Sequence, residues 1–240
     1  MTGLPILVMV MLLAGAQNPV APRTQDALVA LWSGDAALPA RELAVVQAMR
    51  IPHEQRSEAL QRALAKELIR VNNLLKKDKP PIELYGYQSS LLDLVSPSMV
   101  APSLTALVGD LGHGWNVIRA VAKFGEEAVA PLVAATGSVR VEVSTDAIRA
   151  LQVVFEASRY APLSERAKAQ IVSVARERLF GRQNFLVVAE ACGLAASLGD
   201  AQLKRRVEQL ISDPSQAAQM GITEREFQFM KRVIQMAMSR

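Results

Sequence analysis

The sequence predicts an all-α protein, an irregular stack of helical hairpins, and three observations support this prediction. Half of the chain is apolar but only 5% is aromatic, and the apolar residues are mostly Ala, Leu and Val, which suit close helix packing better than a sheet. Apolar residues recur at the helical spacings of three and four. No long run alternates between apolar and polar residues. Residues 139–143 do so only briefly, and we expect a loop and a helix start there.

The first sixteen residues carry no charged side chain, which indicates a segment for export. Residues 4–13 are apolar, and Ala14, Gly15 and Ala16 are the small residues that signal peptidase accepts. The run is too short to span a bilayer comfortably, which takes about 20 apolar residues. We therefore expect a signal peptide over residues 1–16, a mature chain that starts at Gln17, and a periplasmic or secreted protein.

Three alternatives to this signal peptide stay open. No Lys or Arg precedes the apolar run, so the true start could lie upstream, or residues 4–13 could stay uncleaved as a weak membrane anchor. A buried core helix is the third alternative, although the segment has no polar stripe that would face solvent.

Proline positions and apolar spacing predict two helices in an N-terminal portion, residues 17–79. Pro39 lies in the first turn of a helix over residues 39–49, where its missing N–H costs nothing. Pro52 is expected to open a second helix in the same way. The buried stripe of that helix would be Leu60, Leu64, Leu68, Val71 and Leu75. Three lysines and two prolines in residues 76–81 then predict an exposed break before the second portion, residues 80–240.

The second portion is predicted to be helical to its end. Helices are expected over residues 83–94, 103–108 and 115–123, followed by a helix pair over residues 165–181 and 184–194. The last helix, residues 222–238, begins with a capping box of Thr223 and Glu226. Its apolar stripe is Phe227, Met230, Ile234 and Met238. We expect Phe227 and Ile234 to be buried against the helix over residues 203–210.

Two short segments recur at nearly the same offset. The tripeptide Val-Ala-Pro that begins at Val100 returns at Val129, and the Ile-Arg-Ala segment that begins at Ile118 returns at Ile148. The recurrence predicts a unit of about 30 residues that holds two helices and two turns.

Residues 120–151 resemble a bacterial HEAT-like repeat. Residues 120–125 are similar to the end of the second helix of one repeat unit and to the glycine that stops it. Residues 126–133 are similar to the first helix of the next unit, which contains a proline, here Pro131. The acidic, apolar and small positions of the following second helix match Glu142, Val143, Ala147, Ala150 and Leu151. A later stretch, residues 195–214, repeats the likeness, with Leu203, Val207 and Leu210 on the apolar positions. The resemblance covers residues 100–214.

The likeness departs from the family at two points. Ser144 stands where the family has a basic residue, and the spacing exceeds about 30 residues after Ala157. We therefore expect an irregular HEAT-like α-solenoid. If the first helix of the repeat that contains Pro131 begins near Glu126, Pro131 lies past the first turn of that helix and should cause a bend.

The resemblance implies stacked helix pairs with an extended surface that holds another protein. By this likeness the chain would be an exported, non-enzymatic scaffold or adaptor. A structural component of the cell envelope, tethered by residues 4–13, and an enzyme with an unrecognised site are the alternatives.

Catalytic and metal-binding patterns are weak. His53 and His113 stand far apart and outside metal-type spacings, so we predict no metal and no cofactor. Cys192 is the only cysteine and is predicted to be a small buried hydrophobe. Asp146 and Glu142 are one helical turn apart and are expected to be solvated charges.

Basic residues gather in the C-terminal half and form the candidate partner-binding surface. The net charge of +4 is mild for the chain length. The sequence has no basic stripe with interleaved aromatic residues, so we predict no nucleic-acid binding. A positive surface could attract an acidic partner, or these side chains could be solvated outer faces balanced by nearby glutamates. The candidate residues are Arg176, Arg178, Arg182, Lys204, Arg205 and Arg206.

Overall fold

The computed structural model describes residues 22–238, apart from residues 76, 78, 96–100, 113 and 182. Every regular element in these residues is helical, as predicted. The predicted signal segment, its alternatives and His113 lie outside the described residues. The α-helices are α2 (Pro22–Ser33), α3 (Leu38–Met49), α4 (Glu58–Leu75), α5 (Glu83–Asp93), α6 (Ala101–Gly109), α7 (Trp115–Ala122), α8 (Val129–Ala135), α9 (Val141–Ala157), α10 (Glu165–Phe180), α11 (Phe185–Leu198), α12 (Ala201–Ser212), α13 (Pro214–Gln219) and α14 (Glu224–Met238).

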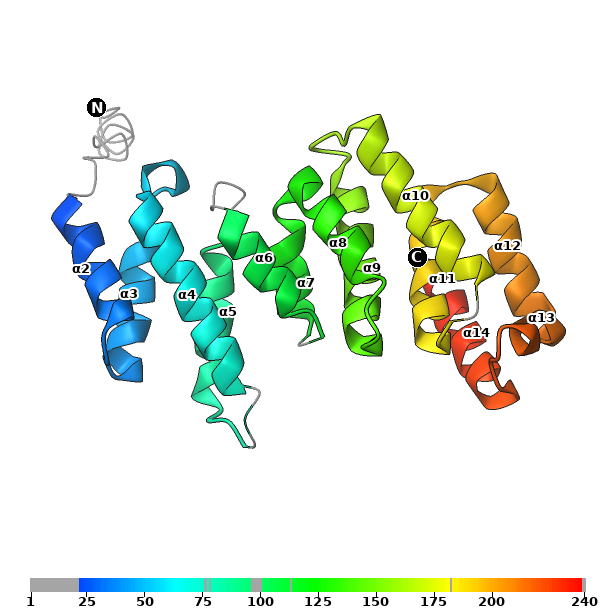
Figure 1. The fold of residues 1–240 in the computed structure, drawn as a ribbon, viewed down its shortest axis with the longest axis horizontal. Helices are drawn as coiled ribbons and strands as arrows, with labels where there is room; N and C mark the ends of the chain where they lie inside the picture. Colours follow the sequence, from blue (N-terminus) through cyan, green and yellow to red (C-terminus); the bar gives the residue numbers. More distant parts are fainter. Residues whose placement is uncertain are drawn as a thin grey trace, which may run out of the picture.

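The helices form two parallel rows, which is the architecture of an α-solenoid. The first helices of the hairpins, α2, α4, α6, α8, α10 and α12, each contact the next in that order. The second helices, α3, α5, α7, α9 and α11, form the other row, which α14 continues. Figure 1 shows the hairpins side by side along one long axis, from α2 to the α12–α14 end. One continuous apolar core runs between the rows from Leu28 to Ile234.

The N-terminal helices follow the prediction with one correction. Pro39 is the second residue of α3, as expected for its first turn. The helix predicted to open at Pro52 begins instead at Glu58, after a 3₁₀ turn His53–Gln55. The cause is Arg56, which is extended and buried. Its Nε donates to the carbonyl of Ile51 at 3.1 Å and its Nη1 to the carbonyl of Leu94 at 2.7 Å, which fixes its side chain. Ser57 then caps α4, because its Oγ accepts from Leu60 N at 3.2 Å.

The predicted helix break is present. α4 ends at Leu75 and α5 begins at Glu83, so no helix runs through Pro80. The segment between them is the turn of one hairpin, because α4 and α5 pack against each other. Its described lysines, Lys77 and Lys79, are exposed. The apolar core continues across this point.

The repeat around Pro131 differs from the prediction. A 3₁₀ turn, Gly125–Ala128, precedes α8, and α8 begins at Val129 rather than near Glu126. Pro131 is therefore the third residue of α8, where a backbone N–H would have no partner within the helix. The first-turn position removes the need for the expected bend. Gly125 has a φ of +56° just after α7, in agreement with the predicted glycine stop.

The C-terminal helix has the predicted cap and a different neighbour. Thr223 N donates to Glu226 Oε2 at 2.9 Å, and Glu226 N donates to Thr223 Oγ1 at 3.4 Å, which is the predicted capping box. Phe227 and Ile234 are buried, as expected. They lie on a helix that packs mainly against α11 rather than α12. The reason is α13, which follows α12 as its hairpin partner and lets α14 continue the second row.

Candidate functional site

A groove of about 730 Å³ runs across the second row of helices. Most of its lining residues belong to α9 and α11. Trp115 of α7 and Val233 of α14 also line it. Small or apolar side chains, among them Val153, Ala189 and Ala196, line its length. The groove therefore joins helices from consecutive repeats in one continuous hollow.

Gly193 lines this groove in the middle of α11. A Cβ at this position would lie 3.3 Å from Gln152 Oε1, closer than an ordinary contact. Any larger side chain would displace Gln152 or fill the groove. The absence of a side chain at this point lets Gln152 of α9 lie directly against α11.

Three polar side chains are fixed across the groove by hydrogen bonds. Gln152 Nε2 donates to Glu156 Oε1 at 2.9 Å and to Ser197 Oγ at 3.0 Å. Ser197 Oγ donates to the same Glu156 oxygen at 2.8 Å. These bonds join α9 to α11, so the polar groups are held in place before any ligand arrives.

Arg149 is held at the same wall by two carboxylates. Its Nη2 lies 2.5 Å from Glu190 Oε1 and its Nη1 lies 3.7 Å from Asp146 Oδ1. The hydrogen bond to Glu190 raises the pKa of Arg149. Two arginines, Arg149 and Arg159, and two glutamates line the groove, so its charge is balanced.

Asp146 corrects the expectation of a solvated charge. It is buried, and its Oδ2 accepts a hydrogen bond from the backbone N of Gly112 at 2.8 Å. The carboxylate thus holds the α6–α7 loop against α9. Ser144, at the position where the family has a basic residue, is also buried and donates to the carbonyl of Thr136 at 2.7 Å. Glu142 is exposed, as expected.

Trp115 is an exposed aromatic residue between two hollows. It is 55% exposed, and it lines both the groove and a recess of about 330 Å³ toward α5. Tyr85, Gln88 and Asn116 line that second recess. Gly114, directly before Trp115, has a φ of +107°, which glycine adopts readily and other residues rarely do. The backbone turn at Gly114 therefore places the indole at the start of α7.

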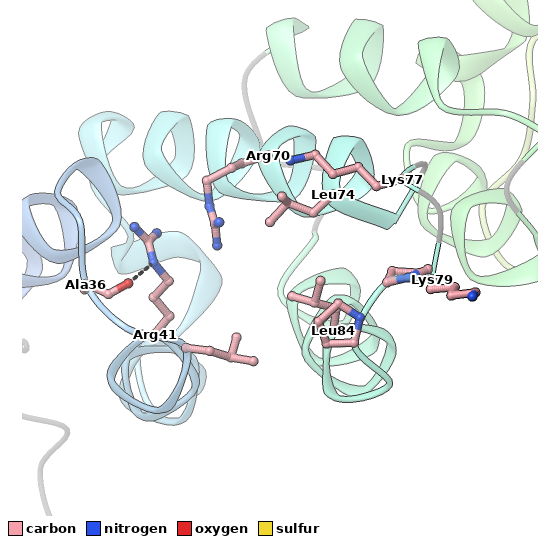
Figure 2. A pocket seen from close by; sticks show the side chains of 10 residues that line it. Ala36, Arg41, Arg70, Leu74, Lys77, Lys79 and Leu84 are labelled. Carbon is pink, nitrogen blue, oxygen red and sulfur yellow. Dashed lines mark hydrogen bonds between the residues drawn. The ribbon is translucent and has the colours of Figure 1, made fainter.

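Another recess, of about 360 Å³, lies at the hairpin-loop edge between α3 and α5 (Figure 2). Its two arginines are bound within the protein. Arg41 Nε donates to the carbonyl of Ala36 at 2.7 Å, and Arg41 Nη1 donates to Glu67 Oε2 at 2.7 Å. Arg70 donates twice to Glu67, each time at 2.7 Å. We interpret this recess as the outer side of a structural ion-pair cluster.

The structure divides the predicted basic surface. Arg206 is a structural link, because its Nε donates to the carbonyl of Leu179 at 3.2 Å and its guanidinium lies 4.9 Å from the ring centre of Phe180. Arg176 lies in a recess between α10 and α12 that Glu177 also lines. Backbone hydrogen bonds, first from Leu203 and then from Gln202, lower the pKa of Asp200, and the charges of Arg176 and Arg205 lower it further.

The remaining members of that surface are Lys204, Arg178 and Arg182. Lys204 is exposed, and Arg178 lines a separate recess beside α11. Arg182 lies outside the described residues. The partner-binding role of the six residues stays a prediction, and the groove with Trp115 was not part of it.

Within the described part of the chain, no three His, Cys, Asp or Glu side chains gather as a metal site. None of the described helices is long and apolar enough to cross a membrane. Cys192 is fully buried, as predicted, and burial raises the pKa of its thiol to about 12. Burial, aided by the charge of Arg56, lowers the pKa of His53.

No protein-family model matches the chain, and no curated protein matches it in sequence. Solved structures similar to it include the designed armadillo repeat protein YIII(Dq)4CqI, at 14% identity and a TM-score of 0.36, over 88% of this chain and 98% of that one. Another is the designed armadillo repeat protein YIII(Dq.V1)4CPAF in complex with peptide (KR)4, at 17% identity and a TM-score of 0.30, over 88% and 80% of the two chains. The solenoid architecture of this chain rests on its own two helix rows.

Proposed function

We propose that this protein is a non-enzymatic scaffold or adaptor that binds an extended segment of a partner protein in the groove along α7, α9, α11 and α14. The observation that carries this proposal is Trp115, an exposed indole between two hollows of consecutive repeats. Aromatic side chains in partly enclosed positions supply much of the binding energy of protein interfaces.

The shape and polarity of the groove support a peptide segment as its occupant. The groove crosses several helices, so a chain lying in it would contact one repeat after another. The bonds among Gln152, Glu156 and Ser197 hold its polar groups in fixed positions, which lowers the entropy lost on binding. Because its charges balance, we expect a segment with an apolar or aromatic anchor and polar neighbours, and no nucleic acid.

Membership of a HEAT-like family and export to the periplasm or the medium are part of the same proposal. They rest on the sequence likeness over residues 100–214 and on the uncharged residues 1–16. A protein tethered through residues 4–13 is the alternative. N-terminal sequencing of the exported protein separates the two, since a start at Gln17 excludes the tether.

A peptide-display selection against the full chain tests the groove. We expect the selected peptides to bind the parent protein and to bind Trp115→Ala about thirtyfold more weakly or worse, the loss typical of an interface hot spot. Tyr160→Ala is the matched control, because Tyr160 is an aromatic residue that is 92% exposed and does not line the groove.

Isothermal titration with a selected peptide gives the affinities. A second variant, Gly193→Leu, places a side chain that fills the groove or displaces Gln152, and it should also weaken binding. Equal affinities for the parent, Trp115→Ala and Gly193→Leu would show that the groove is not the binding site.

A further inference from the structure

A recess of about 470 Å³ at the hairpin-loop edge contains the cation of Arg178, and no described carboxylate lines it. The α8–α9 loop, the first turns of α9 and α11, and Arg178 near the end of α10 line it. None of its lining residues is Asp or Glu. It is separate from the groove, with which it shares no lining residue.

Arg178 is poorly satisfied in this recess. Its Nη1 lies 3.4 Å from Gln183 Oε1 and its Nη2 lies 3.5 Å from Thr136 Oγ1, both at the outer limit of a hydrogen bond. Its Nε is buried and has no acceptor among the described residues. The neighbouring carboxylate, Glu177, accepts a hydrogen bond from Ser173 and lines the recess between α10 and α12 instead.

Two buried arginines, Arg41 and Arg56, find their hydrogen-bond acceptors within the protein. Arg41 donates to three backbone carbonyls and to Glu67. Arg56 donates to two carbonyls, one of them from a distant helix end. A buried guanidinium that lacks such partners is unfavourable, so the state of Arg178 is a departure within this chain and calls for an external acceptor.

Two further lining residues can add hydrogen-bond donors. Asn184 Oδ1 accepts from Leu186 N at 2.9 Å, which leaves the amide N–H₂ of Asn184 available. Ser138 Oγ accepts from Arg140 N at 3.2 Å, which leaves its hydroxyl hydrogen available. The N-terminal ends of α9 and α11, helices of 17 and 14 residues, add positive potential.

We propose that this recess binds an oxyanion, the carboxylate or phosphate group of a small ligand, with Arg178 as its main contact. A guanidinium offers two parallel N–H donors that match the two oxygens of either group. This site goes beyond the proposed peptide groove and does not depend on it.

Titration of the full chain with sodium phosphate and, separately, with sodium acetate tests the site. Amide NMR signals of residues 136–141 and 183–187 report on it, with sodium chloride at equal ionic strength as the reference. We expect saturable shifts with at least one of the two anions. Response to phosphate alone would assign a phosphate ligand, and response to acetate would assign a carboxylate ligand.

Charge removal at one position provides the decisive comparison. Arg178→Gln should weaken anion binding about tenfold to a hundredfold, the loss expected for a charge-assisted hydrogen-bond pair. Arg176→Gln removes the same charge from the same helix but from the recess between α10 and α12, so it should bind as the parent does. No saturable shift with either anion, or equal affinity in Arg178→Gln and the parent, would overturn the proposal.

A second pair of variants keeps the test valid if Arg178→Gln does not fold. Val139 lines the recess and is 99% exposed, so substitution there leaves the core intact. Val139→Glu places a carboxylate at the rim and should weaken anion binding severalfold, whereas the neutral Val139→Gln should not. Equal anion affinity in these two variants would also overturn the proposal.

Discussion

Glu67 is a buried carboxylate shared by three side chains from three helices. Arg41 of α3 and Arg70 of α4 each donate to it at 2.7 Å, and Tyr87 of α5 donates its hydroxyl at 2.8 Å. Burial, together with the negative charge of Glu67, raises the pKa of Tyr87, so this phenol stays a donor. The first two hairpins are therefore joined by charge as well as by apolar packing.

Removal of this carboxylate should destabilise the N-terminal hairpins strongly. Glu67→Ala would leave Arg41 buried without its counter-charge, and we expect it to lower the free energy of unfolding by about 3–5 kcal/mol. Glu58→Ala is the control on the same helix, because Glu58 pairs with Arg62 at the surface, and exposed pairs contribute less than about 1 kcal/mol. Urea denaturation measures both, and similar losses in the two variants would contradict the prediction.

At the scale of elements, a single glutamate links two repeats at the helix start of α10. Glu126, in the 3₁₀ turn before α8, accepts from Ser164 N at 2.8 Å and from Ser164 Oγ at 2.6 Å. Ser164 is itself the N-cap of α10, where its Oγ accepts from Ala167 N at 3.2 Å. The hydrogen bonds from the Ser164 side chain and backbone lower the pKa of Glu126.

This link predicts a loss of stability in acid. Because the pKa of Glu126 is lower in the folded protein than its ordinary value of 4.5, folding favours the carboxylate. The stabilisation is present above pH 4.5 and is lost as the pH falls through the lower, folded pKa. Between pH 7 and pH 3 the melting temperature of Glu126→Gln should therefore fall less than that of the parent.

Glu127→Gln is the matched control for this experiment. Glu127 is the next residue and is exposed, and its side chain makes no hydrogen bond to the described residues. Its variant should show the same acid-induced fall in melting temperature as the parent. Circular dichroism at both pH values gives the comparison, and an undiminished fall in Glu126→Gln would count against the link.

Local sequence signals predicted most elements, and long-range contacts account for the errors. Apolar spacing gave the stripe of α4, and the capping box of Thr223 and Glu226 gave the start of α14. The predicted start of α4 was wrong at a point where the backbone is extended and the side chain of Arg56 is fixed by the carbonyl of Leu94, 38 residues away. The burial of Asp146 was missed for the same reason, since its donor, Gly112 N, is 34 residues away.

The candidate groove could not be predicted from the sequence. It exists because Trp115, Gln152 and Ser197, which belong to three different helices, are brought together by the stacking of repeats. The sequence did contain one signal for it, a tryptophan that directly follows a glycine at the start of a predicted helix. Only the structure shows that this tryptophan lies outside the core.

At the scale of the whole molecule, each helix depends on its neighbours in the stack, so the end of the stack protects the units before it. α14 covers α11 through a stripe that includes Phe227, which is 2% exposed. Cys192 lies in α11 and is fully buried. Loss of the terminal helix should therefore be detectable at this thiol before the N-terminal hairpins unfold.

Phe227→Asp is expected to unfold the terminal pair or the whole domain. The substitution removes a buried ring and places a charge in the core, at a cost of at least about 3 kcal/mol. We expect a lower melting temperature and faster labelling of Cys192 by a thiol reagent. Phe229→Asp is the control, since Phe229 is 46% exposed on the same helix. A melting curve and a labelling rate equal to those of the parent would show that Phe227 is not a core residue.

The two rows of helices also determine how the molecule bends. Because contacts are made between adjacent hairpins, a small rotation at each interface adds to the next along the long axis (Figure 1). A segment bound across α7, α9, α11 and α14 would span several of these interfaces at once and restrict their rotations together. Binding would therefore restrict bending of the C-terminal half, and it would leave the interfaces among α2, α3, α4 and α5 unchanged.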